Sequence, residues 1–485
     1  MKIPLDRRSP QPVYQQIRSR IRRLIESGAL QPGDRLPSIR TLAENAQVNK
    51  LTVIEAYGVL EAEGLIYARA GAGYFVCQPR VETAHPESTF APTQDVIIPN
   101  SGEISYFDFY MTAIRTPETS DMVMFNSGFT HPVGMENAQR IARRALKQSS
   151  NTLYFYDLPQ GQLTLRKQIA QLMIQQGLEI SPENLIVTNG SMQGIALTMR
   201  HYIQPGDWVI VESPTYYGAL AILQQLGARI IGIPMTKEGM NLSLLAQYLH
   251  SHRPVLIYTM STLHNPTGIT TSMAHRQEML AIAAQYQCPI LEDNAYEGLS
   301  FEAVPPPIKA LDDQSLVIYA GTFSKTLMPG LRVGYLVATG DAYQPLLESK
   351  LLMDLCASTA SQTIVSEFLA SGHYRRHLTS LRMCNLQGRN TMLAALERYF
   401  PPEAKWTVPT GGTFLWVTLP ESVPMQQLCH EAAQQQVMIT PGSGFFPNQQ
   451  GYPALRINFS QDPDKIERGI SVLGGLIRRY LDEAQ

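Results

Sequence analysis

The stretch GTFSKTLMPGLR, residues 321–332, places a single lysine among hydroxyl side chains, glycines and one arginine. A lysine amine captures an aldehyde as a Schiff base, while hydroxyl groups and a forked guanidinium bind phosphate. Lys325, Thr322, Ser324 and Arg332 therefore indicate a site for an aldehyde cofactor that carries a phosphate. Because a lone lysine is far more often a solvated surface charge, this interpretation depends on the rest of the chain.

Two earlier segments offer the other partners that pyridoxal phosphate needs. Asp293 ends an apolar, strand-like run, and a carboxylate there keeps the pyridine nitrogen protonated. Tyr296 follows three residues later, and Asn265 lies in a turn after a strand expected over residues 255–260, so both are donors for the ring hydroxyl. Taken singly, Asp293 is just as readily a strand-end or cap carboxylate and Asn265 a turn residue. Their order along the chain favours the cofactor.

Together these motifs make residues 122–485 resemble a fold-type I pyridoxal-phosphate enzyme of the class I and II aminotransferase family. The resemblance implies an α/β domain with a large and a small subdomain. It makes Lys325 the Schiff-base lysine, Asp293 the partner of the ring nitrogen, and Asn265 and Tyr296 the donors to the ring oxygen. Lys325, Asp293 and Tyr296 are the catalytic set that it implies.

The same resemblance assigns the phosphate and the face of the cofactor ring. The run TNGSMQG, residues 188–194, matches a phosphate loop that opens a helix, where backbone N–H groups favour an anion. The segment ESPTYY, residues 212–217, matches the one that supplies an aromatic ring over the cofactor, and Tyr216 fits the register better than Tyr217, with the choice open by one residue. The implied cofactor contacts from these two segments are Ser191, Met192, Gln193 and Tyr216.

Two further matches concern the effector or substrate and the oligomeric state. Arg456 lies in a strand-like alternation, and the resemblance implies that it grips an α-carboxylate, against the simpler interpretation of a surface strand arginine. Tyr156 resembles the tyrosine that reaches the phosphate of a neighbouring subunit. A homodimer that binds an amino acid or amine is therefore implied.

The front of the chain differs in charge from the rest. Residues 1–78 contain eleven Lys or Arg against seven Asp or Glu, an excess of four, whereas the whole chain of 485 residues carries −2, which leaves the remainder at about −6. Such asymmetry suggests that the two parts meet different partners, and a basic segment suits a polyanion such as DNA. Charge alone does not decide this, because solvated helices often carry a similar excess.

The pattern of apolar residues predicts three helices and a hairpin in this front segment. Ile17, Ile21, Leu24 and Ile25 form one stripe, and two more helices are expected after Ser38 and around residues 50–63. Two short β-prone runs over residues 65–76 surround a glycine tip. This is the pattern of a winged helix-turn-helix, an α+β domain whose third helix reads DNA.

The segment QPGDRLPSIRTLA, residues 31–43, closely resembles the GntR family of bacterial regulators, whose operator-binding domains share it. Lys50 and Leu51 stand where many relatives have an arginine and a small polar residue, which puts bidentate guanine reading there in doubt. The contacts to double-stranded DNA that the resemblance implies are Arg35, Ser38, Arg40, Asn49, Lys50 and Thr52, with Gly71 on the wing.

A GntR-type domain ahead of an aminotransferase-like domain is the architecture of the MocR subfamily, which the whole multidomain chain resembles. The expected divisions are a DNA-binding domain over residues 1–78, a linker rich in proline over 79–121, and the pyridoxal-phosphate domain over 122–485.

Composition excludes several other classes of protein. No apolar run approaches the length of a membrane-spanning helix, and the N-terminus lacks a signal peptide, so a cytoplasmic protein without membrane contact is expected. Five cysteines without a Cys-x-x-Cys pair indicate free thiols, and no histidine has a partner at metal-ligand spacing, so no metal is expected.

Two functions remain open. In the first, the protein is a transcription regulator that binds pyridoxal phosphate through Lys325 and senses the cofactor or an amino acid or amine. In the second, it is a metabolic aminotransferase with an accessory DNA-binding domain. Because the site residues are complete, transaminase activity is compatible with both. A complete winged helix-turn-helix has no use in transamination, and this favours the regulator.

Overall fold

The computed structural model describes residues 12–26, 29–31, 33–62, 65–69, 73–76, 96, 111, 121–130, 133, 135, 137–148, 152–449 and 451–484. The chain forms two compact units, the first mainly from Met1–Ser88 and the second from Thr89–Asn385 with Thr391–Gln485, and each is described by itself. Gly71, and most of the linker expected over residues 79–121, lie outside the described residues.

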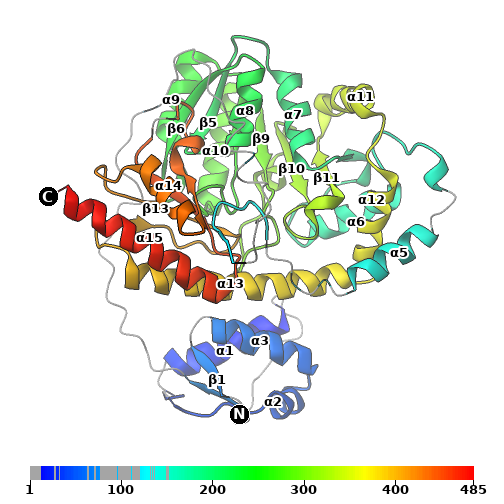
Figure 1. Ribbon diagram of the computed structural model, residues 1–485. Helices are drawn as coiled ribbons and strands as arrows, with labels where there is room; N and C mark the ends of the chain where they lie inside the picture. Colours follow the sequence, from blue (N-terminus) through cyan, green and yellow to red (C-terminus); the bar gives the residue numbers. More distant parts are fainter. Residues whose placement is uncertain are drawn as a thin grey trace. The chain divides into compact units, whose positions relative to one another are not determined.

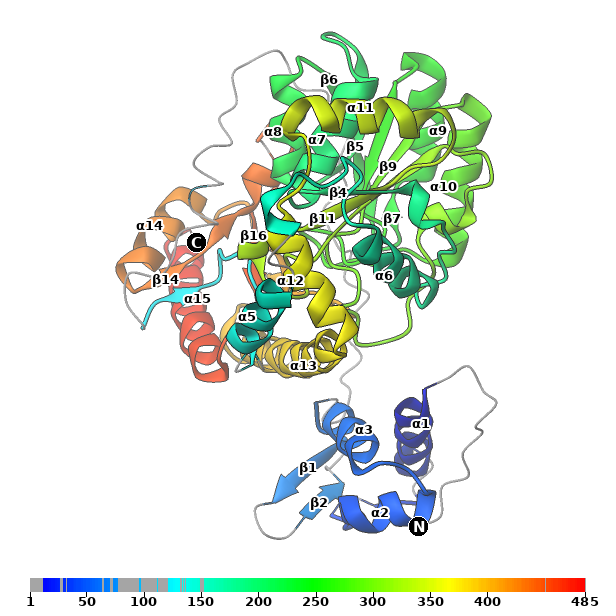
Figure 2. The same cartoon turned by 90° about the vertical axis from the view of Figure 1, so that its right-hand side faces the viewer.

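The N-terminal unit packs three helices around a small core (Figure 2). They are α1 (Val13–Glu26), α2 (Ile39–Ala46) and α3 (Lys50–Ala62). Ile17 and Ile21 of the apolar stripe expected on α1 are fully buried in a cluster with residues such as Leu42, Val53 and Leu60. Leu24 and Ile25 of the same stripe are half-buried. Burial of such a stripe holds three short helices together, since helices of this length are marginal alone.

The connection between α2 and α3 is the turn of a helix-turn-helix. Ser38 begins α2, and its Oγ accepts a hydrogen bond of 3.1 Å from the backbone N–H of Thr41. Gln47 ends α2 in the left-handed region, with φ 53°. Strands β1 (Ile66–Arg69) and β2 (Gly73–Val76) then pair antiparallel as the expected wing. The winged helix-turn-helix predicted from the sequence is therefore confirmed.

The second unit is built on an eight-stranded sheet in the order β4-β11-β10-β9-β8-β5-β6-β7 (Figure 1). Neighbouring strands from β10 to β6 are parallel, whereas β11 runs antiparallel to both β10 and β4, and β7 antiparallel to β6. The strands span β4 (Leu185–Thr188), β5 (Trp208–Ser213), β6 (Arg229–Thr236), β7 (Gly239–Met240), β8 (Leu256–Thr259), β9 (Ile290–Asp293), β10 (Val317–Thr322) and β11 (Gly334–Val337).

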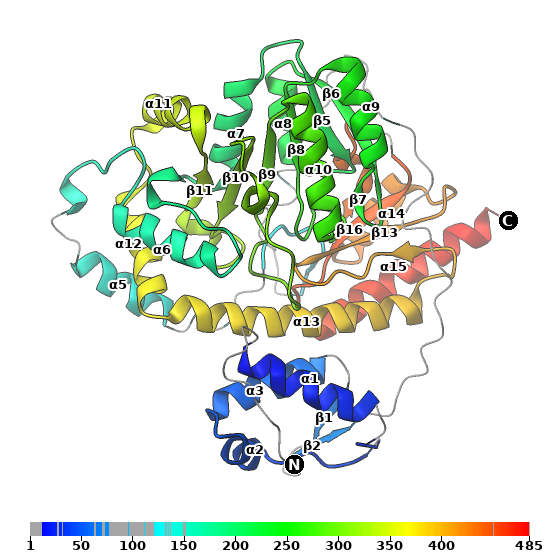
Figure 3. The same ribbon diagram turned by 180° about the vertical axis from the view of Figure 1, so that it is seen from behind.

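Both faces of this sheet are buried, which explains why its strands read as continuous apolar runs. Alternate residues point to opposite faces, so Val209 and Val211 join one core cluster and Ile210 joins the other. Helices α9 (Leu242–His252) and α10 (Met273–Tyr286) cover the second face (Figure 3). The first face is covered by α7 (Ser191–Tyr202) and α8 (Tyr217–Gln225), with α6 (Leu163–Ile174) in the same cluster.

Three more helices flank the large subdomain: α5 (Ala138–Gln148), α11 (Tyr343–Asp354) and α12 (Thr359–Ala370). The 27-residue helix α13 (His373–Tyr399) then leads to a smaller α/β subdomain. Its sheet has the order β12-β13-β16-β15 and has its own core, which it shares with α14 (Met425–Gln434) and α15 (Pro463–Glu483). These strands are β12 (Lys405–Trp406), β13 (Phe414–Thr418), β15 (Thr440–Pro441) and β16 (Ala454–Asn458), and β3 (Val123–Met124) pairs separately with β14 (Val437–Met438).

This arrangement confirms the fold-type I architecture with a large and a small subdomain. The segments singled out in the sequence follow β4, β5, β8, β9 and β10, and the carboxyl ends of these parallel strands meet at one edge. Among the described residues, no helix is both long and apolar enough to span a membrane, and no group of three or more His, Cys, Asp or Glu is placed to hold a metal ion.

Candidate functional site

Lys325 lies just beyond the carboxyl end of β10, and its amine is buried. The Nζ atom donates a hydrogen bond of 2.7 Å to the backbone carbonyl of Gly128 and lies 5.7 Å from the ring centre of Phe129. Burial lowers the pKa of Lys325 to about 8, with further lowering by the positive charges of Arg456 and Arg332. An amine with such a pKa is substantially neutral near pH 8, which a nucleophile requires.

Asp293 ends β9 as a buried carboxylate. Its Oδ2 accepts a hydrogen bond of 2.8 Å from the hydroxyl of Tyr258, and its Oδ1 has no hydrogen-bond partner among the described residues. Burial raises the pKa of Asp293 to about 6, although Tyr258 and the nearby N–H of Ala295 act in the opposite direction. A buried carboxylate oxygen without a donor is costly, and it fits a site built to receive a cation.

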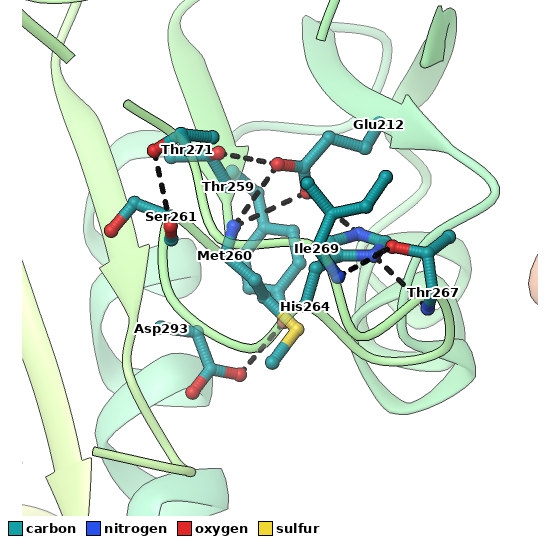
Figure 4. Close-up of polar contacts among 10 residues, drawn as sticks. Glu212, Thr259, Met260, Ser261, His264, Thr267, Ile269, Thr271 and Asp293 are labelled. Carbon is teal, nitrogen blue, oxygen red and sulfur yellow. Dashed lines mark hydrogen bonds and ion pairs between the residues drawn. The ribbon is translucent and has the colours of Figure 1, made fainter. Parts of the chain in front are cut away.

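A second buried carboxylate lies behind this site (Figure 4). Glu212, near the end of β5, accepts hydrogen bonds from the hydroxyl of Thr259 and from the backbone N–H of Met260. Its Oε2 lies 3.3 Å from Nε2 of His264, whose Nδ1 lies 2.8 Å from the hydroxyl of Thr267. These contacts fix the turn that carries Asn265, and nothing in the sequence analysis had marked His264 for this supporting part.

The phosphate end is formed by two loops that meet at a glycine. Gly190 precedes α7 with φ 76°, and a Cβ atom there would lie 2.3 Å from Nη2 of Arg332. Arg332 donates from Nη1 to the hydroxyl of Ser324 at 3.1 Å and from Nη2 to the carbonyl of Asn189 at 3.3 Å. Thr322 joins the same network through a 3.1 Å contact with Ser324. The structure thus brings a guanidinium, two hydroxyls and the N-terminus of α7 together.

The start of α7 contains the three residues expected to contact phosphate. Ser191 and Met192 are half-buried in its first turn. Gln193 is already engaged: its Oε1 accepts from the backbone N–H of Asn189 at 2.8 Å, and its Nε2 donates to Asp354 at 2.7 Å. The Gln193 side chain therefore braces the loop in this structure, and any contribution to the phosphate comes from its position in the first turn.

The two candidate aromatic residues after β5 face different partners. Tyr216 is half-buried, and its ring centre lies 5.0 Å from that of Tyr217. Tyr217 is buried, with its ring centre 5.4 Å from that of Phe445, and it interacts with Arg456. The assignment of Tyr216 rather than Tyr217 to the cofactor ring stays a prediction.

Arg456, in the middle of β16, is almost fully buried. Its Nη2 donates to the carbonyl of Asn126 at 2.7 Å, its Nη1 lies 3.4 Å from Oδ1 of Asn265, and its Nε has no hydrogen-bond partner among the described residues. The rings of Phe414 and Phe445 lie 4.1 and 5.2 Å from the guanidinium carbon. A cation held by rings, carbonyl and amide oxygens has no carboxylate partner here and is suited to bind one.

The donors expected for the ring oxygen lie beside this arginine and the lysine. Asn265 is buried next to Arg456, and the ring centre of Tyr296 lies 5.9 Å from Nζ of Lys325. Burial raises the pKa of Tyr296, so its hydroxyl stays protonated as a donor. By contrast, Tyr156 is 82% exposed and contacts none of these residues in the single chain.

The DNA-binding unit presents a separate candidate interface. Arg40 is exposed on α2, where its Nε pairs with Glu44 at 3.0 Å, and Ser38 is used as the helix cap. Arg35 forms an isolated bridge with Phe75 of β2, and its guanidinium lies 3.5 Å from the Cβ position of Gly73. Arg35 is thus fixed against the wing, whereas Arg40 projects from α2.

The first turn of α3 mixes polar and apolar side chains. Asn49 accepts a hydrogen bond of 3.0 Å from the backbone N–H of Leu51, so it caps the helix, while Lys50 is exposed and Thr52 half-buried. Leu51 is 66% exposed and Ile54 is 41% exposed. Sequence reasoning missed both as candidates, although their position one turn apart, outside the buried stripe, was a readable signal.

The donor set at the carboxyl edge fits pyridoxal phosphate. Lys325 is an amine beside an orphaned carboxylate oxygen of Asp293, and Gly190 leaves room where a Cβ would strike the guanidinium of Arg332. A cationic ring, an aldehyde and a phosphate are the three groups that these features complement. Together with the N-terminal unit, the fold and site define a winged helix-turn-helix domain joined to an aminotransferase-like domain.

Comparison with known proteins agrees with this definition. The model of the family "Aminotransferase class I and II", which depends on pyridoxal phosphate, matches residues 121–473, and that of "Bacterial regulatory proteins, gntR family" matches residues 13–76. The chain belongs to the class I and II aminotransferase family and carries a GntR-type domain, which confirms the MocR-type architecture. It is an HTH-type transcriptional regulator with an aminotransferase-like domain, and the GntR-type domain implies DNA binding.

Individual relatives share either the whole architecture or the second unit. The uncharacterized HTH-type transcriptional regulators YisV of Bacillus subtilis and YdcR of Escherichia coli are each 31% identical to the chain. The first match covers 98% of both chains and the second covers 96% of this chain and 99% of YdcR. Pyrococcus horikoshii kynurenine aminotransferase superposes with a TM-score of 0.73 and 30% identity, over 79% of this chain and 96% of that one.

Proposed function

We propose that this protein is a DNA-binding transcription regulator that binds pyridoxal phosphate through Lys325 and senses the cofactor, or an amino acid or amine that reacts with it. The proposal rests mainly on one observation. The amine of Lys325 and the unpartnered Oδ1 of Asp293 lie in one buried site, and the loop that contains Arg332 lies at the opposite end of that site. The unpartnered oxygen of Asp293 destabilises the unliganded fold, and a bound cation would offset that cost.

Each part of the cofactor then has a partner among the described residues. Lys325 bonds to the aldehyde carbon, Asp293 pairs with the ring nitrogen, and Asn265 and Tyr296 face the ring hydroxyl. Tyr216 lies over the ring. The phosphate is bound by Ser191, Met192 and Gln193 of the first turn of α7, and by Thr322, Ser324 and Arg332. When bound, pyridoxal phosphate supplies a carbonyl that exchanges between amines and a ring that withdraws electrons.

The effector class follows from Arg456. Its Nε is free of hydrogen bonds in the described structure, and two aromatic rings hold the guanidinium in place. An α-carboxylate meets that fork, which places the effector's amine toward Lys325. The neighbouring Tyr217 and Phe445 give the pocket apolar walls on the same side. The effector is therefore an amino acid, with simple amines bound more weakly.

A homodimer completes the proposed site. Three consecutive aromatic residues, Tyr154, Phe155 and Tyr156, are 84%, 76% and 82% exposed, and Leu158 and Leu352 are also largely exposed. Exposed aromatic and apolar side chains that gather on a surface are typical of an interface between chains. In the homodimer, Tyr156 reaches the phosphate of the neighbouring subunit, and two DNA-binding units are linked to one body.

The proposed domains are the DNA-binding domain over residues 1–78, the linker over 79–121 and the pyridoxal-phosphate domain over 122–485.

Operator contacts come from the N-terminal unit. Arg35, Arg40 and Lys50 supply positive charge for phosphates, and Ser38, Asn49 and Thr52 lie at helix starts, where backbone N–H groups favour phosphate. The exposed Leu51 and Ile54 of α3 contact thymine methyl groups in the major groove.

A metabolic aminotransferase with an accessory DNA-binding domain is the second candidate, favoured by the complete set of site residues. Two measurements separate the functions. Pyridoxal phosphate is added to wild type and to Lys325→Ala, and the absorbance band of the lysine-bound cofactor is recorded; the band is expected only in wild type. A gel-shift on the DNA upstream of the chain's own gene then tests operator binding. A band that persists in Lys325→Ala after dialysis refutes the lysine assignment, and rapid turnover of a common amino acid without a gel-shift favours the enzyme.

A further inference from the structure

Residues 121–130, which begin at the last residue of the expected linker, run past the candidate cofactor site. Val123 and Met124 pair with Val437 and Met438 of β14, which attaches the segment to the small subdomain. Phe125 is fully buried, and its backbone carbonyl accepts a hydrogen bond of 3.0 Å from Asn458. This anchoring puts the following carbonyl groups into the site.

Both functional cations of the site hold this segment by its backbone. Lys325 donates to the carbonyl of Gly128 and Arg456 donates to the carbonyl of Asn126, each at 2.7 Å. The hydroxyl of Thr130 donates a hydrogen bond of 3.3 Å to the backbone carbonyl of Lys325. The donors that hold the segment are thus the groups that the proposed function requires for the cofactor and for the effector carboxylate.

A separate side chain holds the segment without entering the cofactor's contacts. Asn458 is fully buried, and its Nδ2 donates to the carbonyls of Ser127 and Phe129 at 2.9 and 2.8 Å. At the other end, Arg468 donates to the carbonyl of Asp121, the last residue of the expected linker. The segment is therefore bound at one end to the site and continues at the other directly into the linker.

We propose that residues 121–130 report occupancy of the cofactor site to the linker, through exchange of the donors of Lys325 and Arg456; this rests on the proposed function. Capture of the aldehyde would join the lysine nitrogen to carbon and release the oxygen as water; at most one N–H donor would remain on the nitrogen, so the hydrogen bond to Gly128 would be weakened or lost. An effector carboxylate on Arg456 competes with the carbonyl of Asn126 in the same way. By linkage, DNA binding changes cofactor affinity by the same factor as the cofactor changes DNA affinity.

The first test uses the wild-type chain and amide hydrogen exchange of peptides that cover residues 121–130. On addition of pyridoxal phosphate, exchange there is expected to speed up about tenfold, as one charge-assisted hydrogen bond is lost. If the lysine-bound cofactor band forms and exchange in this segment is unchanged or slower, the reporting role is wrong and the cofactor site stands. If the band does not form, the proposed function itself has failed.

Variants distinguish signalling through residues 121–130 from an effect of cofactor binding that does not involve this segment. Unloaded Lys325→Ala lacks the donor to Gly128, so its segment exchange and its DNA affinity are expected to match those of loaded wild type. Asn458→Ala is expected to keep the cofactor band while the ratio of DNA affinities with and without cofactor falls to about 1. Asn385→Ala is the matched control, since Asn385 is as buried and donates to Gly412 at 3.1 Å rather than to the segment.

Three results overturn the inference: unloaded Lys325→Ala behaves like unloaded wild type, Asn458→Ala keeps the wild-type ratio, or Asn385→Ala loses that ratio equally. Should Asn458→Ala not fold, the exchange measurement and Lys325→Ala decide the matter without it.

Discussion

Replacement of Asp293 by asparagine should stabilise the cofactor-free chain while it abolishes tight cofactor binding. The reason is the burial of a carboxylate whose Oδ1 lacks a hydrogen-bond partner among the described residues. Its pKa is raised from 3.8 to about 6 by that burial. A shift of about two units corresponds to about 3 kcal/mol of destabilisation by the ionised group at neutral pH.

Part of the stability that Asp293→Asn gains is offset by a new unpaired group. The amide keeps the acceptor for Tyr258 but introduces an NH₂ group without a partner, at a cost of about 1–2 kcal/mol. The net stabilisation of Asp293→Asn at pH 7.5 is then about 1–2 kcal/mol, or about 2 °C in the Tm of a unit of this size. Cofactor affinity is expected to fall at least about 100-fold, since the cationic ring loses its buried counter-charge.

The pH dependence of thermal stability tests independently whether the ionised Asp293 destabilises the fold. Because the folded-state pKa of Asp293 is raised, its cost is fully present above pH 6 and disappears as pH falls toward the unfolded value of 3.8. Thermal unfolding without cofactor, measured from pH 8 to about pH 4, should therefore show the advantage of Asp293→Asn shrink through that window.

Glu292→Gln is the matched control on the same strand. Glu292 accepts hydrogen bonds from Ser261 and from the backbone N–H groups of Ile308 and Lys309, the latter two at 2.9 Å. Its replacement is expected to destabilise the fold by about 1–3 kcal/mol. If Asp293→Asn is instead less stable than wild type at pH 7.5, Asp293 is a structural carboxylate and the reasoning fails.

Three further predictions concern the phosphate loop, the lysine and the recognition helix. Gly190→Ala should weaken cofactor binding at least about tenfold in an absorbance titration, since its Cβ would lie 2.3 Å from Arg332. The rate of cofactor capture should rise with pH and level off near pH 8, because the pKa of Lys325 is lowered to about 8 and only the neutral amine attacks. Leu51→Ala with Ile54→Ala should lower operator affinity about tenfold and leave binding to unrelated DNA within about twofold.

Each of these three predictions has an outcome that would contradict it, and two of them have a control variant. Gly206→Ala imposes similar backbone strain at φ 94° with no atom within 4 Å of its Cβ, and an equal loss of cofactor affinity there would exclude the collision as the cause. Capture that still accelerates tenfold per pH unit above about pH 9 means an ordinary lysine. Val408→Ala removes a 63% exposed apolar side chain in the other unit, and an effect equal to that of the recognition-helix pair contradicts base reading.

Local patterns predicted the elements of this fold well. The helix start at Ser38, the wing and the strand that ends at Asp293 all follow from neighbouring residues, whose periodicity and capping chemistry act over a few positions. The motifs also lay in the right order, so their meeting at one sheet edge could be anticipated from parallel strands alone.

Contacts between distant segments were not predictable in this way. Tyr258 meets Asp293 across 35 residues, Gln193 meets Asp354 across 161, and Lys325 meets the carbonyl of Gly128 across 197. A backbone carbonyl has no residue signature, so nothing in the sequence marks it as the partner of the lysine. The orphaned oxygen of Asp293, which carries the functional proposal, appears only once its surroundings are known.

The most direct test of the regulator account is an equilibrium titration of the chain's own upstream DNA with the same protein preparation, with and without saturating pyridoxal phosphate. The account predicts that the cofactor band is present and that DNA affinity changes about fivefold or more, equivalent to at least about 1 kcal/mol of coupling. Equal DNA affinities in the two titrations, with the cofactor demonstrably bound, would contradict it.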